Sequence, residues 1–199
     1  MKHYFTNSDV KSNLKKISCN VCDKKFVFNT DNGVFSKRGL DFGSRTLIMT
    51  LLEQDITGDV LDVGCGYGAL GIILSSFFNI NVDMVDVNNR ALHLSKMNQK
   101  ENDIANLNIF NSNIYDNVTK KYDAVITNPP IRAGKSVYLT IINVAFNHLN
   151  VDGELWFVMR NNHGVKTVIK DLSKKYNTSV LKKDAGYYVV MVKNGESNL

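Results

Sequence analysis

Proline is scarce in this 199-residue sequence, and its only two prolines are adjacent, in the stretch Asn128-Pro129-Pro130. Proline fixes its own φ angle and disfavours the α conformation in the residue before it, so this stretch is stiff and extended. The residues before it, AVIT at 124–127, form an apolar run typical of a buried strand. The prolines therefore mark a strand end, which is either a rigid turn or the rigid support of a binding site.

Long apolar runs are also absent. No segment approaches the roughly 18 to 20 apolar residues that cross a membrane, and the first residues, MKHYFTNSDVKSNLKK, lack the apolar core of a signal peptide. We therefore expect no membrane partner and a cytoplasmic location. With 44% hydrophobic and 22% charged residues, the composition is that of an ordinary soluble protein that folds as one compact unit, and we expect a monomer.

Cysteine is limited to Cys19, Cys22 and Cys65. The first two form a C-x-x-C pair, which supplies half of the ligands of a structural zinc site, but no second pair follows in the sequence. The alternation of Ile17, Cys19 and Val21 instead favours small residues of a β-strand. We therefore expect no metal site.

The order of apolar and polar residues divides the chain into two regions. Residues 1–45 alternate loosely and contain turn signals, which indicates a small antiparallel extension that we expect to cover the ligands. From residue 46 onward, strands and helices alternate. We predict strands at residues 59–64, 81–87, 107–112, 122–129, 153–159, 178–184 and 186–193. We predict helices at residues 46–54, 68–78, 89–102, 136–149 and 165–176.

Apolar strands that alternate with helices are typical of a doubly wound α/β domain, in which helices cover both faces of a mostly parallel sheet. The last two predicted strands are joined only by a short DAG turn at 184–186, so they must be antiparallel. No repeat or linker interrupts residues 46–199, and we expect one Rossmann-like domain there. Ligands of such sheets bind at the carboxyl ends of the strands.

A glycine-rich loop follows the first strand of this domain, in the stretch DVGCGYG at 62–68. Its alternate glycines permit a sharp turn and let a ligand approach the next helix N-terminus. The second strand ends in Asp86, 22 residues after Gly64, where a carboxylate can accept both hydroxyls of a ribose. An NAD site shares that spacing, but G-x-G-x-G after an aspartate favours a nucleoside with an amino-acid end over a diphosphate. The alternative is a tight turn with Asp86 as a helix cap.

VLDVGCGYGALG, residues 60–71, resembles motif I of class I S-adenosylmethionine-dependent methyltransferases, and NPPIRAG, residues 128–134, resembles motif IV of amino-group N-methyltransferases. Together with GVFSKRGLDFGSRTL at 33–47 and HLNVDGELWFV at 148–158, they resemble the RsmC-type family, which methylates guanine N2 in small-subunit (16S) ribosomal RNA. The resemblance covers nearly the whole chain after residue 30. The chain looks like a short, single-domain version, without the degenerate second half of the Gram-negative members.

The resemblance implies S-adenosylmethionine as the cofactor and ribosomal RNA, or the small ribosomal subunit, as the partner. Within the implied cofactor site, Asp86 holds the ribose. Asn113 stands where the superfamily often has an acidic residue near the adenine, and its side-chain oxygen can still accept from the adenine amino group. The implied cofactor residues are Asp62, Gly64, Cys65, Gly66, Gly68, Asp86, Val87, Asn113 and Asn128.

The same resemblance assigns catalysis to the residues from Asn128 to Ile131. The Asn128 side-chain oxygen and the Pro129 carbonyl can accept the N–H groups of a target amine and direct its nitrogen toward the methyl group, without a strong base. Pro129 and Pro130 keep these acceptors fixed. Ile131 stands where many N-methyltransferases carry an aromatic residue that stacks on the flipped base, which disfavours an N-P-P-Y type of enzyme.

Arginine is scarce, although the chain carries a net charge of +5. An excess of positive charge suits a polyanionic partner, and the planar arginine fork suits phosphates and base edges. Of the five arginines, Arg90, Arg132 and Arg160 follow predicted strands. We expect RNA contacts from Arg38, Arg45, Arg132 and Lys135.

Two other functions remain open. One is methylation of another amino group, either the N6 of a tRNA adenine or a protein glutamine, which Ile131 disfavours. The other is a catalytically silent RNA-binding or ribosome-assembly module that has kept the fold. The intact glycine loop, Asp86 and Asn128-Pro129-Pro130 argue against a silent module, which would not need all of them.

Overall fold

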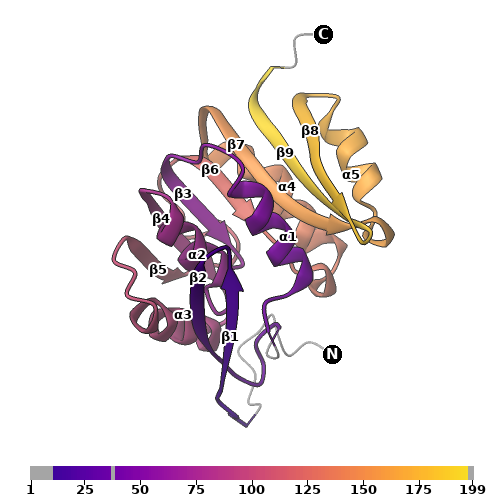
Figure 1. Cartoon of the computed structure of the whole chain (residues 1–199). Coiled ribbons are helices and arrows are strands. Elements are labelled where there is room, and N and C mark those ends of the chain that lie inside the picture. Colours follow the sequence, from indigo (N-terminus) through magenta and orange to yellow (C-terminus); the bar gives the residue numbers. More distant parts are fainter. Residues whose placement is uncertain (1–10, 37–38, 197–199) are drawn as a thin grey trace.

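A seven-stranded sheet forms the centre of the computed structural model, which describes residues 11–36 and 39–196 (Figure 1). Its strands are β3 (Gly58–Val63), β4 (Ile80–Asp86), β5 (Leu107–Asn111), β6 (Tyr122–Thr127), β7 (Leu149–Arg160), β8 (Tyr176–Asp184) and β9 (Tyr187–Glu196). They lie in the order β5-β4-β3-β6-β7-β9-β8. The first five pair in parallel, whereas β9 is antiparallel to both β7 and β8. The predicted doubly wound, mostly parallel sheet with an antiparallel C-terminal end is confirmed.

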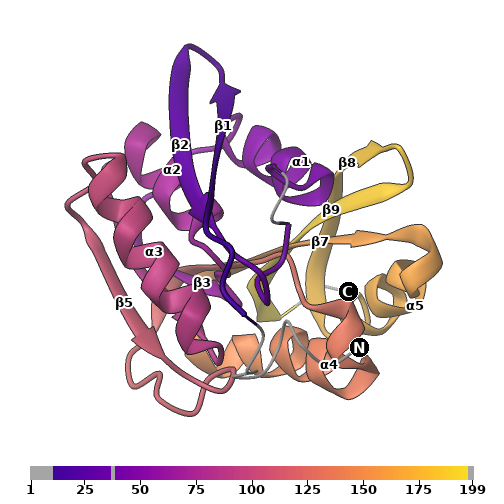
Figure 2. The ribbon, with the colours of Figure 1, turned by 90° about the horizontal axis from the view of Figure 1, so that it is seen from below.

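Within the described residues, five α-helices cover the two faces of this sheet. They are α1 (Phe42–Leu51), α2 (Ala69–Phe77), α3 (Asn89–Glu101), α4 (Lys135–Val144) and α5 (Val165–Leu172). In Figure 2, α1, α2 and α3 lie on one face, and α4 and α5 lie on the other. Alternate strand residues supply the two cores: Val60 of β3 packs on the side of α1–α3, and its neighbour Leu61 packs on the side of α4 and α5. Among the described residues, no helix is both long and apolar enough to cross a membrane.

The predicted N-terminal antiparallel element is also present, as a hairpin of β1 (Lys15–Val21) and β2 (Lys24–Thr30). Cys19 lies within β1, whereas Cys22 lies in the turn, with φ of 50°. The hairpin is fixed to α3 by buried Asn98, whose Oδ1 accepts from Asn29 N at 2.6 Å and whose Nδ2 donates to Asn29 O at 3.0 Å. Asn98 Nδ2 also donates to the Tyr67 carbonyl at 2.8 Å, so the hairpin supports the glycine loop.

Several element boundaries differ from the sequence prediction; for example, the helix predicted at 165–176 ends at Leu172. Helix α1 begins at Phe42 instead of residue 46, because Asp41 caps it: Asp41 Oδ2 accepts from Ser44 N at 2.9 Å. The division expected after residue 45 thus falls inside α1. The predicted helix at 136–149 ends early, because α4 gives way to a 3₁₀ turn, η2 (Ala145–His148), and β7 begins at Leu149.

The order of the strands creates a switch point between β3 and β6. From β3 the chain continues to β4 and β5 on one side, and it returns to β6 on the other side. Thr127, at the end of β6, donates from Oγ1 to the Val63 carbonyl at 2.8 Å, which ties the two strand ends together. A doubly wound sheet opens a crevice at this point, so the functional site is expected above these strand ends.

Candidate active site

A cavity of about 740 Å³ opens above the carboxyl ends of β3, β4, β6 and β7. This volume is in the range of small-molecule binding sites. The structure brings most of the predicted site residues together here: Gly64, Cys65, Gly66, Asp86, Val87, Asn113, Asn128, Pro129, Pro130, Ile131 and Arg132 all line the cavity. Residues Asp62, Gly68, Arg45 and Lys135 do not line it, and Arg38 lies outside the described residues.

The glycine loop presents bare backbone to this cavity. Gly64 and Gly66 have φ angles of 74° and 58°, which favour glycine. A Cβ on Gly66 would meet nothing within 4 Å, and one on Gly64 would meet only Pro130 Cδ, at 3.8 Å. The loop is held in place by Gly64 N and Cys65 N, which donate to the Val85 carbonyl at 2.9 and 3.0 Å. A bound molecule can therefore approach the loop backbone closely.

Asp86 stands at the end of β4 with both carboxylate oxygens partly used. Oδ2 accepts from Gly66 N at 2.9 Å, and Oδ1 accepts from Asn88 N at 2.8 Å. Burial raises the pKa of Asp86, and these backbone hydrogen bonds oppose that rise. Each carboxylate oxygen has a further lone pair, so Asp86 can still accept from two hydroxyl groups.

Asp62 and Gly68 lie behind the loop instead of facing the cavity. Asp62 is 0% exposed; its Oδ2 accepts from Gly71 N at 3.1 Å, and its Oδ1 has no hydrogen-bond partner among the described residues. Burial raises its pKa to about 7. Gly68 has φ of 95°, and a Cβ there would lie 2.9 Å from Met84 Cε. Both residues therefore fix the turn from β3 into α2.

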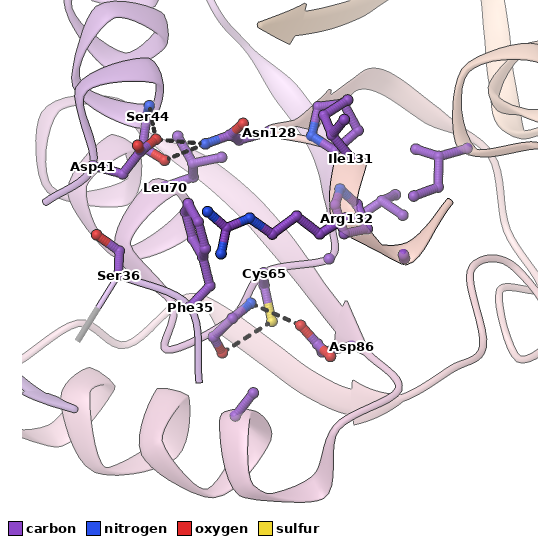
Figure 3. Close-up of a pocket in the computed structure, with 18 of the residues that line it drawn as sticks. Phe35, Ser36, Asp41, Ser44, Cys65, Leu70, Asp86, Asn128, Ile131 and Arg132 are labelled. Carbon is purple, nitrogen blue, oxygen red and sulfur yellow. Dashed lines mark hydrogen bonds between the residues drawn. The ribbon is translucent and has the colours of Figure 1, made fainter. Parts of the chain in front are cut away.

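Asn128 follows β6 and is held by α1 (Figure 3). Its Nδ2 donates to Asp41 Oδ2 at 2.8 Å and to Ser44 Oγ at 2.9 Å. Both amide protons are thereby used, and within the described residues no hydrogen bond reaches Oδ1. The network identifies which end of the amide is nitrogen, because a carboxylate oxygen accepts hydrogen bonds. The side chain thus offers an oriented acceptor at the cavity.

The two prolines make a tight exit from β6. The Pro129 carbonyl accepts from Ile131 N at 2.9 Å, which occupies one of its two lone pairs. Pro130 then begins a 3₁₀ turn, η1 (Ile131–Ala133), and Gly134, with φ of 116°, leads into α4. The Asn-Pro-Pro stretch is therefore a rigid turn, and it also places an amide and a carbonyl beside the glycine loop.

Residues 25–191 match the family of the methyltransferase small domain, known as MTS. The chain belongs to this methyltransferase family. It is 41% identical to the uncharacterized protein YbxB of Bacillus subtilis, over 96% of this chain and 98% of that protein. It is 40% identical to the ribosomal RNA small subunit methyltransferase C of Erwinia tasmaniensis, over 63% of this chain and 38% of that protein. The chain therefore spans about two fifths of the length of that methyltransferase C.

Solved structures of methyltransferases share the fold of this methyltransferase domain. A 16S rRNA N2 methyltransferase of T. thermophilus, RsmC, in complex with AdoMet and guanosine, matches with a TM-score of 0.83 and 24% identity. The match covers 94% of this chain and 52% of that one. A methyltransferase of Pyrococcus furiosus matches with a TM-score of 0.67 and 22% identity, over 82% of this chain and 90% of that one.

The mouth of the methyltransferase cavity is aromatic and basic. Phe35 is 46% exposed and lines the cavity, and in Figure 3 the Arg132 side chain extends from η1 in its direction. The Arg160 guanidinium lies 5.0 Å from the ring centre of Tyr187, and both residues line the cavity. Burial, together with the charges of Arg160 and Arg132, lowers the pKa of His163 at the same mouth. A planar, electron-rich ligand would suit such a rim.

Asn113 contributes a second oriented amide to the wall of the cavity. Its Nδ2 donates to Asp116 Oδ2 at 3.0 Å, which leaves Oδ1 without a hydrogen bond from any described residue. The amide has the same orientation as that of Asn128: the nitrogen donates to a neighbouring carboxylate, and the oxygen is left to accept from a ligand. The two asparagines therefore both offer acceptors to a ligand that carries N–H groups.

Two other residues predicted to contact RNA, Arg45 and Lys135, do not line the cavity, and neither does Arg90, which follows a predicted strand. Arg45 donates from Nη1 to the Asn20 carbonyl at 3.0 Å and so links α1 to the hairpin. Arg90 donates to the Asn32 carbonyl at 2.7 Å and lies 3.8 Å from Asp31, so it supports the segment after β2. Lys135 is exposed at the first position of α4, just outside the cavity-lining residues of η1.

Sequence reasoning assigned no role to four residues that line the site: Phe35, Asp41 and Ser44, which lie within the quoted stretch 33–47, and Tyr187, which lies outside the quoted stretches. Asp41 carried a usable signal, because an aspartate directly before a helical run is a helix cap. No local pattern marks Phe35 or Tyr187, which face the cavity only through the fold. Among the described residues, no group of three or more His, Cys, Asp or Glu side chains is placed to hold a metal ion.

Proposed function

We propose that this methyltransferase domain transfers a methyl group from S-adenosylmethionine to the exocyclic N2 amino group of a guanine in small-subunit (16S) ribosomal RNA. The observation that carries the proposal is the Asn128 amide, which is anchored through its nitrogen and offers its oxygen beside the glycine loop. Such an acceptor suits a target that donates N–H groups, as an exocyclic amine does. The named relatives that act on ribosomal RNA support the choice of substrate.

The residues on the cavity wall fit the cofactor. The Gly64–Gly66 backbone leaves room for close approach, Asp86 can accept the two ribose hydroxyls, and Asn113 Oδ1 can accept from the adenine amino group. When bound, S-adenosylmethionine supplies an electrophilic methyl group on a sulfonium. Asp62, whose buried carboxyl group is partly unpaired, lies behind the glycine loop and stabilises the shape of that loop by accepting from Gly71 N.

The target amine is activated by position. A guanine amino group is conjugated with the ring, and its nitrogen becomes a better nucleophile when acceptors hold its N–H bonds out of that conjugation. Asn128 Oδ1 and the second lone pair of the Pro129 carbonyl supply two acceptors on a rigid turn. The nitrogen gains the methyl group as the carbon–sulfur bond breaks, and it then loses one proton to solvent. None of these residues needs to be a strong base, because positioning supplies most of the effect.

Binding of RNA is assigned to the rim of the cavity. Arg132 lines the cavity, and Lys135 stands at the N-terminus of α4 with no acidic residue in that first turn. A cation at a helix N-terminus opposes the helix dipole, so its presence costs stability unless an anion is bound there. A phosphate at this position would relieve that cost. Phe35 and Tyr187 can stack on bases, which offsets the aliphatic side chain of Ile131.

Analysis of the methylated product tests the proposal. The purified protein is incubated with labelled S-adenosylmethionine and with small subunits, or their naked 16S RNA, from a strain that lacks the corresponding gene. Nucleoside mass spectrometry is expected to identify N2-methylguanosine in that RNA, with transfer RNA and large-subunit RNA as controls. Label in N6-methyladenosine, or in protein, would contradict the proposal and favour methylation of another amino group.

A further inference from the structure

The N-terminus of α1 is joined to the Asn-Pro-Pro turn by a small polar cluster, although Asp41 and Asn128 are 87 positions apart in the sequence. One atom, Asp41 Oδ2, accepts both from Ser44 N at 2.9 Å and from Asn128 Nδ2 at 2.8 Å. Ser44 Oγ lies 2.9 Å from the same Asn128 nitrogen. Figure 3 shows the three side chains converging at the edge of the cavity.

From this cluster we infer that Asp41 and Ser44 are positioning residues, which set the direction of the Asn128 amide and so the kind of group that the site accepts. A primary amide that turns by half a rotation exchanges a hydrogen-bond acceptor for a donor at the same place. The Asp41 carboxylate can only accept and therefore excludes the turned form, and Ser44 Oγ accepts the second amide proton. The site therefore presents oxygen and selects an N–H donor over a carbonyl or a ring nitrogen. This inference rests on the proposed function.

Replacing Asp41 by alanine would remove both the hydrogen bond to Asn128 and the cap of α1, because Oδ2 accepts in both. The variant Asp41→Ser separates them. Serine is as good a helix cap as aspartate, but its hydroxyl ends one bond closer to the backbone and is withdrawn from Asn128. Asp41→Asn is the conservative counterpart, because its single amide oxygen can take the place of Oδ2 and accept from both Ser44 N and Asn128.

The second acceptor offers its own pair of variants. Ser44→Ala removes the hydroxyl but keeps the backbone N–H that Asp41 caps. Thr46→Ala is the matched control: it also removes a buried hydroxyl from α1, one that donates only within the helix, to the Phe42 carbonyl at 2.9 Å. We expect Thr46→Ala to methylate at the native rate.

Single-turnover methyl transfer to the small subunit is measured for these variants, with thermal unfolding and calorimetric titration of S-adenosylmethionine alongside. Asp41→Ser and Ser44→Ala are expected to lower the single-turnover rate constant, together by on the order of tenfold or more, with the melting temperature and cofactor affinity near native. Asp41→Asn is expected to recover most of the rate. In an Asn128→Ala background, Asp41→Ser should cause no further loss, because it acts through Asn128.

The outcomes distinguish this inference from the function on which it rests. Native rates for Asp41→Ser and Ser44→Ala, or a full additional loss from Asp41→Ser in the Asn128→Ala background, would overturn the positioning role alone. Absence of methyl transfer by the native protein would overturn the proposed function and this inference with it. If the native protein methylates another amine, the same variants are compared on that amine, and the same pattern of rates is expected.

Discussion

Two aspartates at the ends of adjacent strands have different surroundings and different tasks. Asp86 lines the cavity, with two backbone N–H groups on its carboxylate and lone pairs to spare. Asp62 lies on β3 with no exposed surface and one oxygen without a partner among the described residues. Burial, helped by the charge of Asp86, raises the pKa of Asp62 to about 7. The Asp86 carboxyl group is therefore available to a ligand, whereas the Asp62 carboxyl group holds the loop.

The pKa of Asp62 predicts how stability depends on pH. The ordinary pKa of an aspartate, 3.8, applies in the unfolded chain, and the folded value is about 7, so the folded state binds this proton more tightly between those values. Between pH of about 4 and about 7, Asp62 is ionised in the unfolded chain but protonated in the folded one. The free energy of unfolding therefore falls as pH rises through this range, by up to about 1.4 kcal/mol per pH unit.

Urea unfolding without cofactor measures the free energy of unfolding of the native protein and of Asp62→Asn across this pH range. The variant lacks the titrating group, so the native protein should lose stability relative to it as pH rises, and the difference should be constant outside the window. A difference that does not change with pH would show that the Asp62 carboxyl group keeps one charge state throughout.

Asp86 carries the prediction for cofactor binding. Asp86→Ala removes both acceptors for the ribose, and we expect S-adenosylmethionine to bind more weakly by about 1 to 3 kcal/mol, the cost of unpaired hydrogen bonds to a charged group. Because burial raises the pKa of Asp86, the native affinity should fall as acidification protonates it, and the variant should not respond. Calorimetric titration measures both effects, with exposed Asp55→Ala as the control. Unchanged affinity in Asp86→Ala, or tight binding of NAD by the native protein, would refute the assignment.

At the scale of elements, helix α2 lies unusually close to β4. A Cβ on Gly71 would lie 2.7 Å from Met84 Sδ and 2.9 Å from Met84 Cγ, so the helix can approach the strand only because residue 71 is glycine. Gly71 N also donates to Asp62, within the turn that carries the glycine loop. The close approach thus fixes the helix end that faces the cavity.

Gly71→Ala should therefore destabilise the protein, although alanine is the better helix former. We expect a loss of about 1 to 3 kcal/mol in the free energy of unfolding, as for other overpacked cores. Ser75→Ala in the same helix is the control, because Ser75 Oγ is buried without a hydrogen-bond partner among the described residues and its removal should cost nothing. A stabilised Gly71→Ala protein in denaturant unfolding would mean that helix and strand separate easily.

The local elements of the site could be predicted from the sequence because each is encoded over a few residues. The glycine loop, Asp86 at a strand end and the Asn-Pro-Pro turn all have their signal next to the residue concerned. The clamp on Asn128, formed by Asp41 and Ser44, could not be predicted, because Asp41 meets Asn128 only after α1 folds against the sheet. The start of β7 at Leu149 was missed because the apolar pattern of the predicted helix at 136–149 runs on through buried Leu149, and the next three residues, 150–152, are only partly buried or exposed.

At the scale of the whole molecule, the positive charge near the cavity predicts how RNA binding responds to salt. Arg132→Ala combined with Lys135→Ala should weaken binding to 16S RNA and reduce the slope of log K against log salt by about 0.7 for each phosphate that these side chains neutralise. Lys96→Ala with Lys100→Ala removes the same charge from exposed positions of α3 and serves as the matched control. Equal slopes for the two double variants would show that the rim of the cavity does not bind phosphate.

The proposed mechanism depends most directly on Asn128, which the turn after β6 and the side chains of Asp41 and Ser44 hold in place. A variant at Asn128 is therefore the most direct test of that mechanism. Asn128→Ala removes one oriented acceptor from a turn that the prolines keep in shape, and such interactions act mainly in the transition state. The measurement is single-turnover transfer of labelled methyl to small subunits from a strain lacking the gene, at saturating S-adenosylmethionine. We predict a loss on the order of a hundredfold or more, with most of the cofactor and RNA affinity retained. Methylation by Asn128→Ala at the native rate would contradict the proposed role of Asn128 and reduce Asn-Pro-Pro to a rigid turn.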